Sequence, residues 1–234
     1  MKPVSRIAKA YPDRVEVRGR DLTGDLMGRI GFTEYFHLLL TGEEPTEEQR
    51  FFLDLLLVSI AEHGLMPTNV AARMTLAADP ESLHGAVAAG ILGAGPVVLG
   101  TSEECAKLLA EGGEPAEIVR RHREAGLKVP GFGHPVHTPV DPRAERILEL
   151  ADERGVSGPN VDLARALRAE LGIVMNVSMP IAAVMLDLGF PPAAVKAVPI
   201  LARTASLLAH LAEERELPLG FVLARAAEEA VEYE

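Results

Sequence analysis

The sequence predicts an all-α fold with one small β-hairpin at its N-terminus. Most of the chain consists of segments about 10 to 18 residues long that are rich in Leu, Ala, Arg and Glu, as amphipathic helices are. Glycine and proline separate these segments, at the points where helices begin and end. Strand-like sequence occurs only from Ile7 to Val17, with Tyr11, Pro12 and Asp13 as the turn.

Capping residues and breakers place the individual helices. Thr46 and Gln49 form a capping box, in which each side chain bonds the other's backbone N–H. Asp141 followed by Pro142 supplies a cap and then a proline in the first turn, where its missing N–H costs nothing. Pro199 predicts a kink in the last long helix. The pattern predicts helices over 46–64, 102–112, 115–126, 141–155, 160–172 and 191–214, with Ser102 and Asn160 as further N-caps.

Length and composition limit the class of protein. The chain has 234 residues and a mass of 25.0 kDa, which corresponds to one large domain or two small ones. Its single cysteine, Cys105, excludes an internal disulfide and a site of several thiolates. We expect a cytoplasmic protein, because disulfides are absent and neither a membrane-spanning apolar run nor the apolar core of a signal peptide is present.

The charge balance is acidic, with 23 Lys and Arg against 34 Asp and Glu and a formal net charge of −11. Sequence-independent nucleic-acid binding needs a basic face, and the sequence contains no basic stripe. We therefore expect neither nucleic acid nor membrane as a partner. A small anion can still bind where a few arginines gather locally.

The segment most suggestive of chemistry is KVPGFGHPVHTPVDPRAERI, residues 128–147. Helical periodicity breaks there, and Gly131 and Gly133 allow backbone amides to face a ligand. His134 can exchange a proton near neutral pH, and Arg143 can clamp a carboxylate. Together they suit an anionic oxo-acid. On these residues alone, an ordinary Gly/Pro turn explains the segment equally well.

The motifs PGFGHPVH and DPR within this segment resemble the signature of citrate synthase and its relatives, including citryl-CoA lyase. The resemblance extends over nearly the whole chain, and a short citryl-CoA lyase-like subgroup is the most similar in length. The other segments that carry it, in the family's order, are 18–49, 61–74, 82–100, 175–195 and 202–214.

This resemblance implies a large helical domain, residues 1–99 with 185–234, and a small one, residues 100–184. An acyl-CoA and an oxo-acid would meet between them, without a metal, in a homodimer. By resemblance, His134 acts on the oxo-acid oxygen, and Arg143, Arg203 and His63 bind the oxo-acid. The loop that receives the adenine of coenzyme A falls on Lys128, Val129, Gly131, Phe132 and Gly133.

Two positions depart from the family pattern. The synthases carry a histidine after the helix at 82–97 that polarises the thioester carbonyl, and here that position falls on Val98 or Leu99. Their catalytic aspartate falls on Ser178, a poor proton acceptor without a neighbouring base. Loss of an oxyanion-type donor typically costs about 2.7–4 kcal/mol of barrier, so the standard condensation would be severely impaired.

Several other residues could carry chemistry but have simpler interpretations. His84 is a candidate replacement for the missing histidine, although a helical or capping role suits it better. His137 could move protons or bind a phosphate, but it reads first as an exposed loop residue. Glu103 and Glu104 are explained by the helix dipole, and Cys105 by burial.

The sequence therefore supports two hypotheses. The first is an enzyme that makes or breaks a C–C bond between an acyl-CoA and an oxo-acid, such as acetyl-CoA and oxaloacetate, with His134 and Ser178 as catalytic candidates. The second is a binding or regulatory protein that keeps the ligand pocket without the chemistry. A purely structural helical protein would require the four matches at His63, His134, Arg143 and Arg203 to be accidental.

Overall fold

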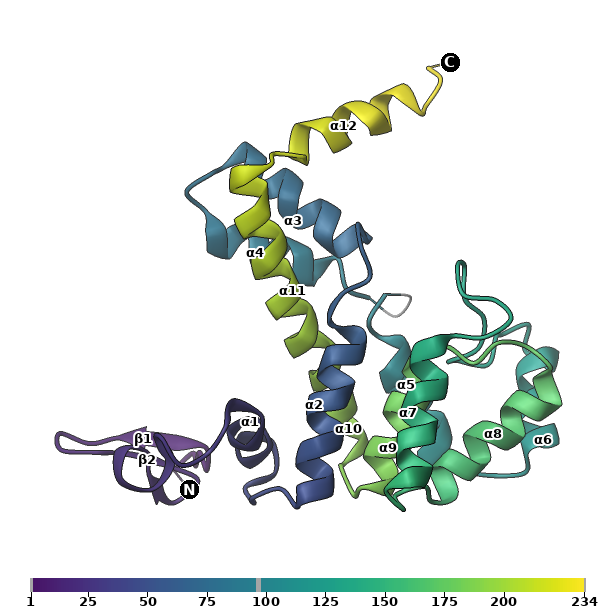
Figure 1. Cartoon of the computed structure of the whole chain (residues 1–234), viewed down its shortest axis with the longest axis horizontal. Coiled ribbons are helices and arrows are strands. Elements are labelled where there is room, and N and C mark those ends of the chain that lie inside the picture. Colours follow the sequence, from purple (N-terminus) through teal and green to yellow (C-terminus); the bar gives the residue numbers. More distant parts are fainter. Residues whose placement is uncertain (1, 96–97, 234) are drawn as a thin grey trace. The chain divides into compact units, whose positions relative to one another are not determined.

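The computed structural model describes residues 2–95 and 98–233 and confirms the predicted fold class: helices with a small N-terminal sheet (Figure 1). The chain separates into two compact units, Met1–Asp54 and Leu55–Glu234. The large and small domains expected from the family resemblance stay a prediction. The α-helices are α1 (Phe32–Thr41), α2 (Glu47–Ala61), α3 (Pro67–Ala78), α4 (Leu83–Leu92), α5 (Thr101–Glu111), α6 (Pro115–Glu124), α7 (Pro142–Glu153), α8 (Pro159–Leu171), α9 (Ser178–Asp187), α10 (Pro192–Val195), α11 (Ala197–Glu216) and α12 (Gly220–Glu229).

The first unit holds the sheet and α1. Strands β1 (Ala8–Ala10) and β2 (Val15–Val17) form the predicted antiparallel hairpin, and a third strand, β3 (Arg20–Asp21), extends it. The sequence did not indicate β3, because two residues are too few for an alternating pattern. A short π-helical turn, η1 (Leu22–Leu26), follows. Its buried residue, Leu26, packs with Val17 of β2 and Leu38 of α1.

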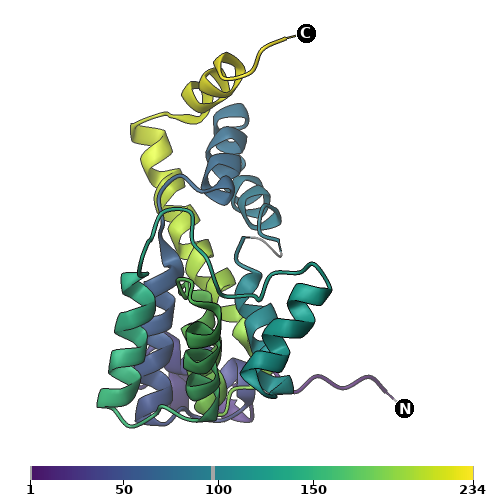
Figure 2. The same ribbon diagram turned by 90° about the vertical axis from the view of Figure 1, so that its right-hand side faces the viewer.

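Within the second unit, α11 packs against α3 and α4, and α12 packs against α3 (Figures 1 and 2). A second group forms around α9, which packs against α5, α7 and α8. Seven residues of α9 are buried, so this helix is the core of its group. The apolar centre of the first group consists of Ala72, Leu76, Ala86, Leu207 and Leu211.

Two of the four predicted N-caps are confirmed. The backbone N–H of Gln49 donates to Thr46 Oγ1 at 3.2 Å, and that of Thr46 donates to Gln49 Oε1 at 2.9 Å, which confirms the capping box. Asp141 caps α7 by accepting from the backbone N–H of Arg143 at 3.1 Å. Helices α2 and α7 therefore begin where short-range chemistry places them.

The other two predicted caps were wrong. Gly100 precedes α5, and Ser102 is buried in its first turn. At α8, Asn160 lies inside the helix, and the carboxylate of Asp187 accepts from the backbone N–H groups of Gly158, Asn160 and Val161 at 2.9–3.0 Å. A carboxylate from α9 thus satisfies the free N–H groups of α8, and this long-range partner left no local signal.

The C-terminal helical region also differs from the expectation. It breaks at Lys196, between α10 and α11, whereas Pro199 lies in the first turn of α11 and needs no kink there. The helix expected over 82–97 ends at Leu92, and residues 96–97 lie outside the described part of the chain. By length and composition, Pro192–Glu216 could cross a membrane, but half of its most apolar stretch is buried in the structure, as in the core helices of water-soluble proteins.

Candidate functional site

A cavity of about 470 Å³ in the second unit brings together residues that are far apart in the sequence. Its wall is formed by the turn before α3, the segment leading into α5, the loop before α7, and the first turns of α7, α9 and α11. All the predicted catalytic and oxo-acid residues line it, together with both positions where a polarising histidine was expected: His63, Val98, Leu99, His134, Arg143, Ser178 and Arg203.

The loop carrying His134 is held against the segment that precedes α9. Gly133 N–H donates to Val174 O at 2.7 Å, and Asn176 N–H donates to Gly131 O at 2.9 Å. The Asn176 side chain adds a bond from Nδ2 to Gly133 O at 3.0 Å. These bonds make a short antiparallel bridge, so the position of His134 is fixed from both sides of the loop.

Hydrogen bonds assign the proton on the His134 ring. Nδ1 of this ring accepts from the backbone N–H groups of Val136 and His137, at 3.1 and 2.9 Å. A neutral imidazole carries one proton, which therefore lies on Nε2. Burial lowers the pKa of His134, and the neighbouring His137 lowers it further, so the ring is neutral at pH 7. Its Nε2–H is available as a hydrogen-bond donor.

Arg143 is fixed by the buried carboxylate of Asp141. Its Nε and Nη2 donate to the two carboxylate oxygens at 3.0 and 2.9 Å, a bidentate geometry. Burial alone would raise the pKa of Asp141, but the hydrogen bond and positive charge of Arg143 outweigh it and lower that pKa. Nη2 of Arg143 also lies 3.4 Å from Nε2 of His134. Two donors so close together suit a shared oxygen acceptor from a ligand.

Arg203 is a buried cation that is not in direct contact with a counterion, although the negative charge of Glu62 acts on it. Its side chain is 2% exposed, and Nη1 donates to Asn69 Oδ1 at 2.7 Å. Within the described residues, its Nε has no hydrogen-bond partner and the guanidinium forms no ion pair. Burial lowers the pKa of Arg203, although this group stays protonated in proteins. A buried charge is costly unless it is paired, so the site is incomplete without an anion.

A polar network connects Arg203 to the backbone of His63. Asn69 Nδ2 donates to Ser206 Oγ at 3.4 Å, and Ser206 Oγ donates to Glu62 Oε2 at 2.6 Å. Glu62 Oε1 in turn accepts from the backbone N–H groups of His63 and Gly64, at 2.8 and 2.7 Å. Helices α3 and α11 therefore hold the turn that carries His63.

The far end of this network is a buried ion cluster. Arg73 Nε donates to His210 Nδ1 at 3.1 Å, so the proton of a neutral His210 lies on Nε2, 3.0 Å from Glu62 Oε2. Arg73 also bonds Glu214 at 2.9 Å and contacts Glu213. Burial alone would raise the pKa of Glu62, but bonds from Ser206 and His210 lower it to about 2.

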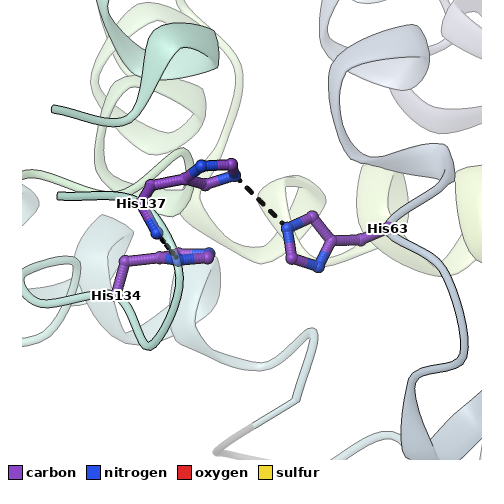
Figure 3. A group of neighbouring side chains, drawn as sticks. All are labelled: His63, His134 and His137. Carbon is purple, nitrogen blue, oxygen red and sulfur yellow. Dashed lines mark hydrogen bonds between the residues drawn. The ribbon is translucent and has the colours of Figure 1, made fainter.

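Three imidazoles face one another at the cavity: His63, His134 and His137 (Figure 3). Their possible ligand atoms lie within 4.8 Å of one another, as in a metal site. However, Nδ1 of His134 accepts two backbone bonds and its Nε2 carries the proton, so this ring has no free lone pair to coordinate an ion. Two guanidinium groups line the same cavity. This set of groups suits an anion better than a cation.

The positions that depart from the family pattern contribute no titratable group to the cavity. Val98 and Leu99 present aliphatic side chains, and Leu99 has a φ of +66°, a left-handed conformation that is uncommon for leucine. Ser178 opens α9, where its backbone N–H donates to Asn176 Oδ1 at 3.1 Å. The described cavity wall therefore has imidazole and guanidinium donors, and no carboxylate base lines it.

The residues predicted to bind the nucleotide lie largely at a second cavity, of about 340 Å³. Lys128, Val129, Phe132 and Gly133 line it, together with Arg123 of α6. Gly133 lines both cavities. Gly131 lines neither and has a packing role: at its φ of +82°, a Cβ would lie 2.7 Å from the buried Cys105 Sγ.

Sequence analysis missed the supporting residues of the site. Asp141 was assigned only as a cap, because its bond to the backbone N–H of Val177, 36 residues away, has no local signal. His137 was assigned to an exposed loop. One signal was available: Arg203, Ser206 and His210 recur at helical spacing along α11 and form a polar stripe in an otherwise apolar helix.

The alternative chemical candidates have ordinary roles. Glu103 forms ion pairs with Lys107 and Lys196 at 3.3 and 2.7 Å, and Glu104 with Lys107 at 2.9 Å, so neither acts as a free base. His84 is exposed in the first turn of α4 and does not line the cavity.

Comparison with known proteins gives consistent results. Residues 6–220 match the family described as citrate synthase, C-terminal domain. The citrate synthase of Heyndrickxia coagulans is 27% identical over 199 residues, which is 80% of this chain and 53% of that protein. The chain thus spans about half the length of the curated relatives it matches.

Among solved structures, the citryl-CoA lyase of Hydrogenobacter thermophilus superposes with a TM-score of 0.83 at 30% identity, covering 90% of this chain and 86% of that one. The ATP citrate lyase of Methanosaeta concilii, solved with (3S)-citryl-CoA, superposes with a TM-score of 0.82 at 20% identity. The superposition covers 100% of this chain and 42% of the ATP citrate lyase chain. At this low identity, the similarity is one of fold alone.

Proposed function

Because the chain belongs to the citrate synthase family, we propose that it is an enzyme that makes or breaks a C–C bond between an acyl-CoA and an oxo-acid. The leading reaction is cleavage of citryl-CoA to acetyl-CoA and oxaloacetate. The observation that carries this proposal is Arg203, a buried guanidinium that lines the cavity and forms no ion pair within the described residues, although the charge of Glu62 acts on it from beyond ion-pair distance. A dicarboxylate in the cavity pairs with it directly.

The donors of the cavity suit both ends of such a substrate. Arg203 and Arg143 bind its carboxylates, and His63 adds a further polar contact. The Nε2–H of His134 donates to the oxygen that is a hydroxyl in citryl-CoA and a carbonyl in oxaloacetate. Negative charge develops on this oxygen when the C–C bond forms. In cleavage it develops as the hydroxyl loses its proton to solvent, before the C–C bond breaks and the α-carbon of the acetyl group takes up a proton. The fixed donor stabilises the oxygen in this charged state.

The second cavity supports coenzyme A as the carrier of the acyl group. Arg123 and Lys128 place positive charge beside it, which suits the phosphates of the nucleotide. Gly133, next to His134, lines both cavities, so the two ligands would meet at the His134 loop. The solved relative that binds (3S)-citryl-CoA provides the same kind of ligand on the same fold.

The direct test is to incubate the purified chain with citryl-CoA and to follow oxaloacetate by coupled oxidation of NADH. We expect release of oxaloacetate and acetyl-CoA in equal amounts. His134→Ala should lower the rate at least about 100-fold, the usual cost of losing one fixed donor to a developing charge. His84→Ala is the matched control, because His84 is exposed on α4 and lines neither cavity. No release by the unsubstituted chain would contradict the proposal.

A second candidate function is a binding or regulatory protein for acyl-CoA or a dicarboxylate. The aliphatic Val98 and Leu99 and the hydroxyl of Ser178 favour it, because they stand where the family's synthases carry catalytic groups. Calorimetry distinguishes the two candidates. Tight binding of coenzyme A or oxaloacetate with no turnover of any acyl-CoA supports the binding protein, whereas turnover that depends on His134 supports the enzyme.

We further propose a cytoplasmic homodimer, as expected for this family. Large apolar side chains of α12, Phe221 and Val222, are 72% and 59% exposed and are candidates for the contact. Light scattering should give twice the 25.0 kDa mass of the chain, and a mass of 25.0 kDa would exclude the dimer.

A further inference from the structure

His137 does not itself line the cavity, but it contacts two rings that do. The sequence suggested proton transfer or phosphate binding for it, with an exposed loop position as the simpler interpretation. Its Nε2 lies 3.4 Å from Nε2 of His63, and its ring centre lies 4.4 Å from that of His134 (Figure 3). Its backbone N–H fixes the His134 ring by donating to Nδ1. Thus two rings that line the cavity each contact His137.

The charged groups around the His63–His137 pair are two arginines and two carboxylates. Arg143 and Arg203 act on His63 as positive charges and His134 flanks it as a neutral ring, while Asp141 is the opposing negative charge. The Asp141 carboxylate is already engaged by Arg143, and Glu62 is engaged by Ser206, His210 and two backbone N–H groups. At His63 the positive charge of Arg143 has a larger effect than the negative charge of Asp141, and Arg203 adds to it, so the balance at this ring favours an anion over a metal ion.

The short contact between the two rings also limits their protons. Two Nε2 atoms at 3.4 Å can form a hydrogen bond only if one carries a proton and the other accepts it. Burial and the charge of Arg143 lower the pKa of His63, so the surroundings of this ring disfavour its charged form. A dianion placed among these groups reverses the balance, because an opposite charge favours the protonated imidazole.

We propose that His137 is an anion-binding residue of this site and that the His63–His137 pair takes up one proton when a dicarboxylate binds. The proton comes from the buffer and goes to an imidazole nitrogen, and no bond to carbon forms or breaks. The pair then carries one positive charge, and both Nε2 atoms hold a proton that can be donated to the ligand. This inference rests on the proposed function, because both use the same cavity, but it concerns binding and not turnover.

The test is calorimetry of oxaloacetate binding at pH 7 in buffers of different ionisation enthalpy. Both carboxylic acids of oxaloacetate are ionised at this pH, so any proton exchanged belongs to the protein. We expect uptake of up to about one proton for each oxaloacetate bound. The affinity for oxaloacetate should then rise as the pH is lowered from 8 to 7, by up to about tenfold. Heat that is independent of the buffer, or failure to bind at all, would overturn the inference.

Substitution assigns the proton to the pair. His137→Gln keeps a donor but cannot titrate, so we expect lower affinity and no proton uptake, with affinity constant over the same pH range. His84→Gln, exposed on α4, is the matched control and should behave as the unsubstituted chain. His137→Asn is the second variant if the first alters the far-ultraviolet circular dichroism. Unchanged proton uptake in a folded His137 variant would exclude the assignment.

Two further measurements separate the alternatives. Titration with Zn²⁺ in place of oxaloacetate tests the metal interpretation, and tight Zn²⁺ binding that requires His137 would overturn the proposal. The citryl-CoA assay is independent of both. If oxaloacetate binding takes up a proton but citryl-CoA is not cleaved, the enzymatic proposal is wrong and this inference holds. If citryl-CoA is cleaved but oxaloacetate binding takes up no proton, this inference is wrong and the enzymatic proposal holds.

Discussion

Two buried arginines in the second unit stand in opposite electrostatic situations. Arg73 is fully buried and bonds Glu214, itself 3% exposed, while Arg203 is 2% exposed and forms no ion pair within the described residues. Removing one partner of a buried ion pair leaves the other charge buried and uncompensated, which lowers stability. Removing a buried charge that has no ion-pair partner takes away such a cost, which raises stability. The two side chains should therefore affect stability with opposite signs.

Arg203→Gln should raise the melting temperature of the ligand-free protein while weakening dicarboxylate binding. The change removes a buried charge and keeps a donor for Asn69, for a gain of about 1 kcal/mol. Loss of a charged contact to the ligand costs about 2–5 kcal/mol, which is at least about 30-fold in Kd. Calorimetric melting and titration measure both. A lower melting temperature would mean that the guanidinium is balanced without a ligand.

Arg73→Met is the opposite case. It leaves Glu214 buried without its cation, so we expect a loss of about 3–5 kcal/mol in the free energy of unfolding. Urea denaturation measures this loss, and the double variant with Glu214→Leu should recover part of it because both charges are then removed. A loss below about 1 kcal/mol would show that the ion cluster adds little to stability.

Glu62 makes stability depend on pH. Its pKa is lowered from 4.5 to about 2 in the folded chain, so its contribution is complete above pH 4.5 and is lost as pH falls towards 2. The side chain is 50% exposed, and screening by water reduces the contribution to about 1 kcal/mol. The urea midpoints of the unsubstituted chain and Glu62→Gln should differ at pH 7 and converge between pH 4.5 and 2. A constant difference would exclude the carboxylate charge as its cause.

Helices and loops position these side chains, and Gly131 is a closely packed point beside the His134 loop. Its φ is +82°, and a Cβ there would lie 2.7 Å from Cys105 Sγ and 2.8 Å from Met179 Cβ. Gly133 has a φ of +87° but open space around a Cβ. Comparing substitutions at Gly131 and Gly133 therefore distinguishes the cost of backbone strain, which both share, from the cost of a collision with neighbouring side chains, which arises only at Gly131.

Gly133→Ala should cost about 1–2 kcal/mol, the strain of a left-handed alanine. Gly131→Ala should cost about 1–3 kcal/mol more, because α5 and α9 must also separate, and the bridge that holds His134 should loosen. Unfolding in urea compares the two variants, and the citryl-CoA rate or oxaloacetate affinity reports on His134. Equal losses in both variants would show that the contact with Cys105 and Met179 is easily relieved.

Elements were predictable where their causes are local. The Thr46–Gln49 capping box and the Asp141 cap needed only residues three or fewer apart. The cap of α8 was missed because Asp187 reaches it from 27 residues away, as sequence spacing gives no measure of which helices pack together. The family resemblance named His63, His134, Arg143 and Arg203, whereas their supports at Asp141 and Glu62 required the folded chain.

At the scale of the molecule, an acidic chain carries two arginines in one cavity. The net charge of −11 disfavours anions at long range, and two guanidinium groups attract them only inside the cavity. At about 0.15 M ionic strength charges are screened over about 8 Å, so the local cations decide binding and the distant acidic groups do not. The composition led us to expect no nucleic-acid partner, but it could not indicate where an anion would bind.

Ligand binding should protect the second unit selectively. Every residue lining the two cavities belongs to Leu55–Glu234, and Met1–Asp54 contributes none. A ligand at about 100 times its Kd adds about 2.7 kcal/mol to the state that binds it, which slows exchange about 100-fold at amides exposed only when that unit opens. Hydrogen exchange with oxaloacetate and coenzyme A should therefore slow in 98–102, 131–137 and 199–206.

Amides of 8–41 serve as the internal control for this measurement, because they hold the sheet and α1 of the first unit. If they exchange at the same rate with and without ligand, the binding energy stays within the unit that supplies the contacts. If they slow by the same factor, the two units open as one cooperative structure, since a ligand can stabilise only those states in which its site is formed. The exchange rates at 8–41 thus show whether ligand binding beside Arg203 also stabilises the first unit.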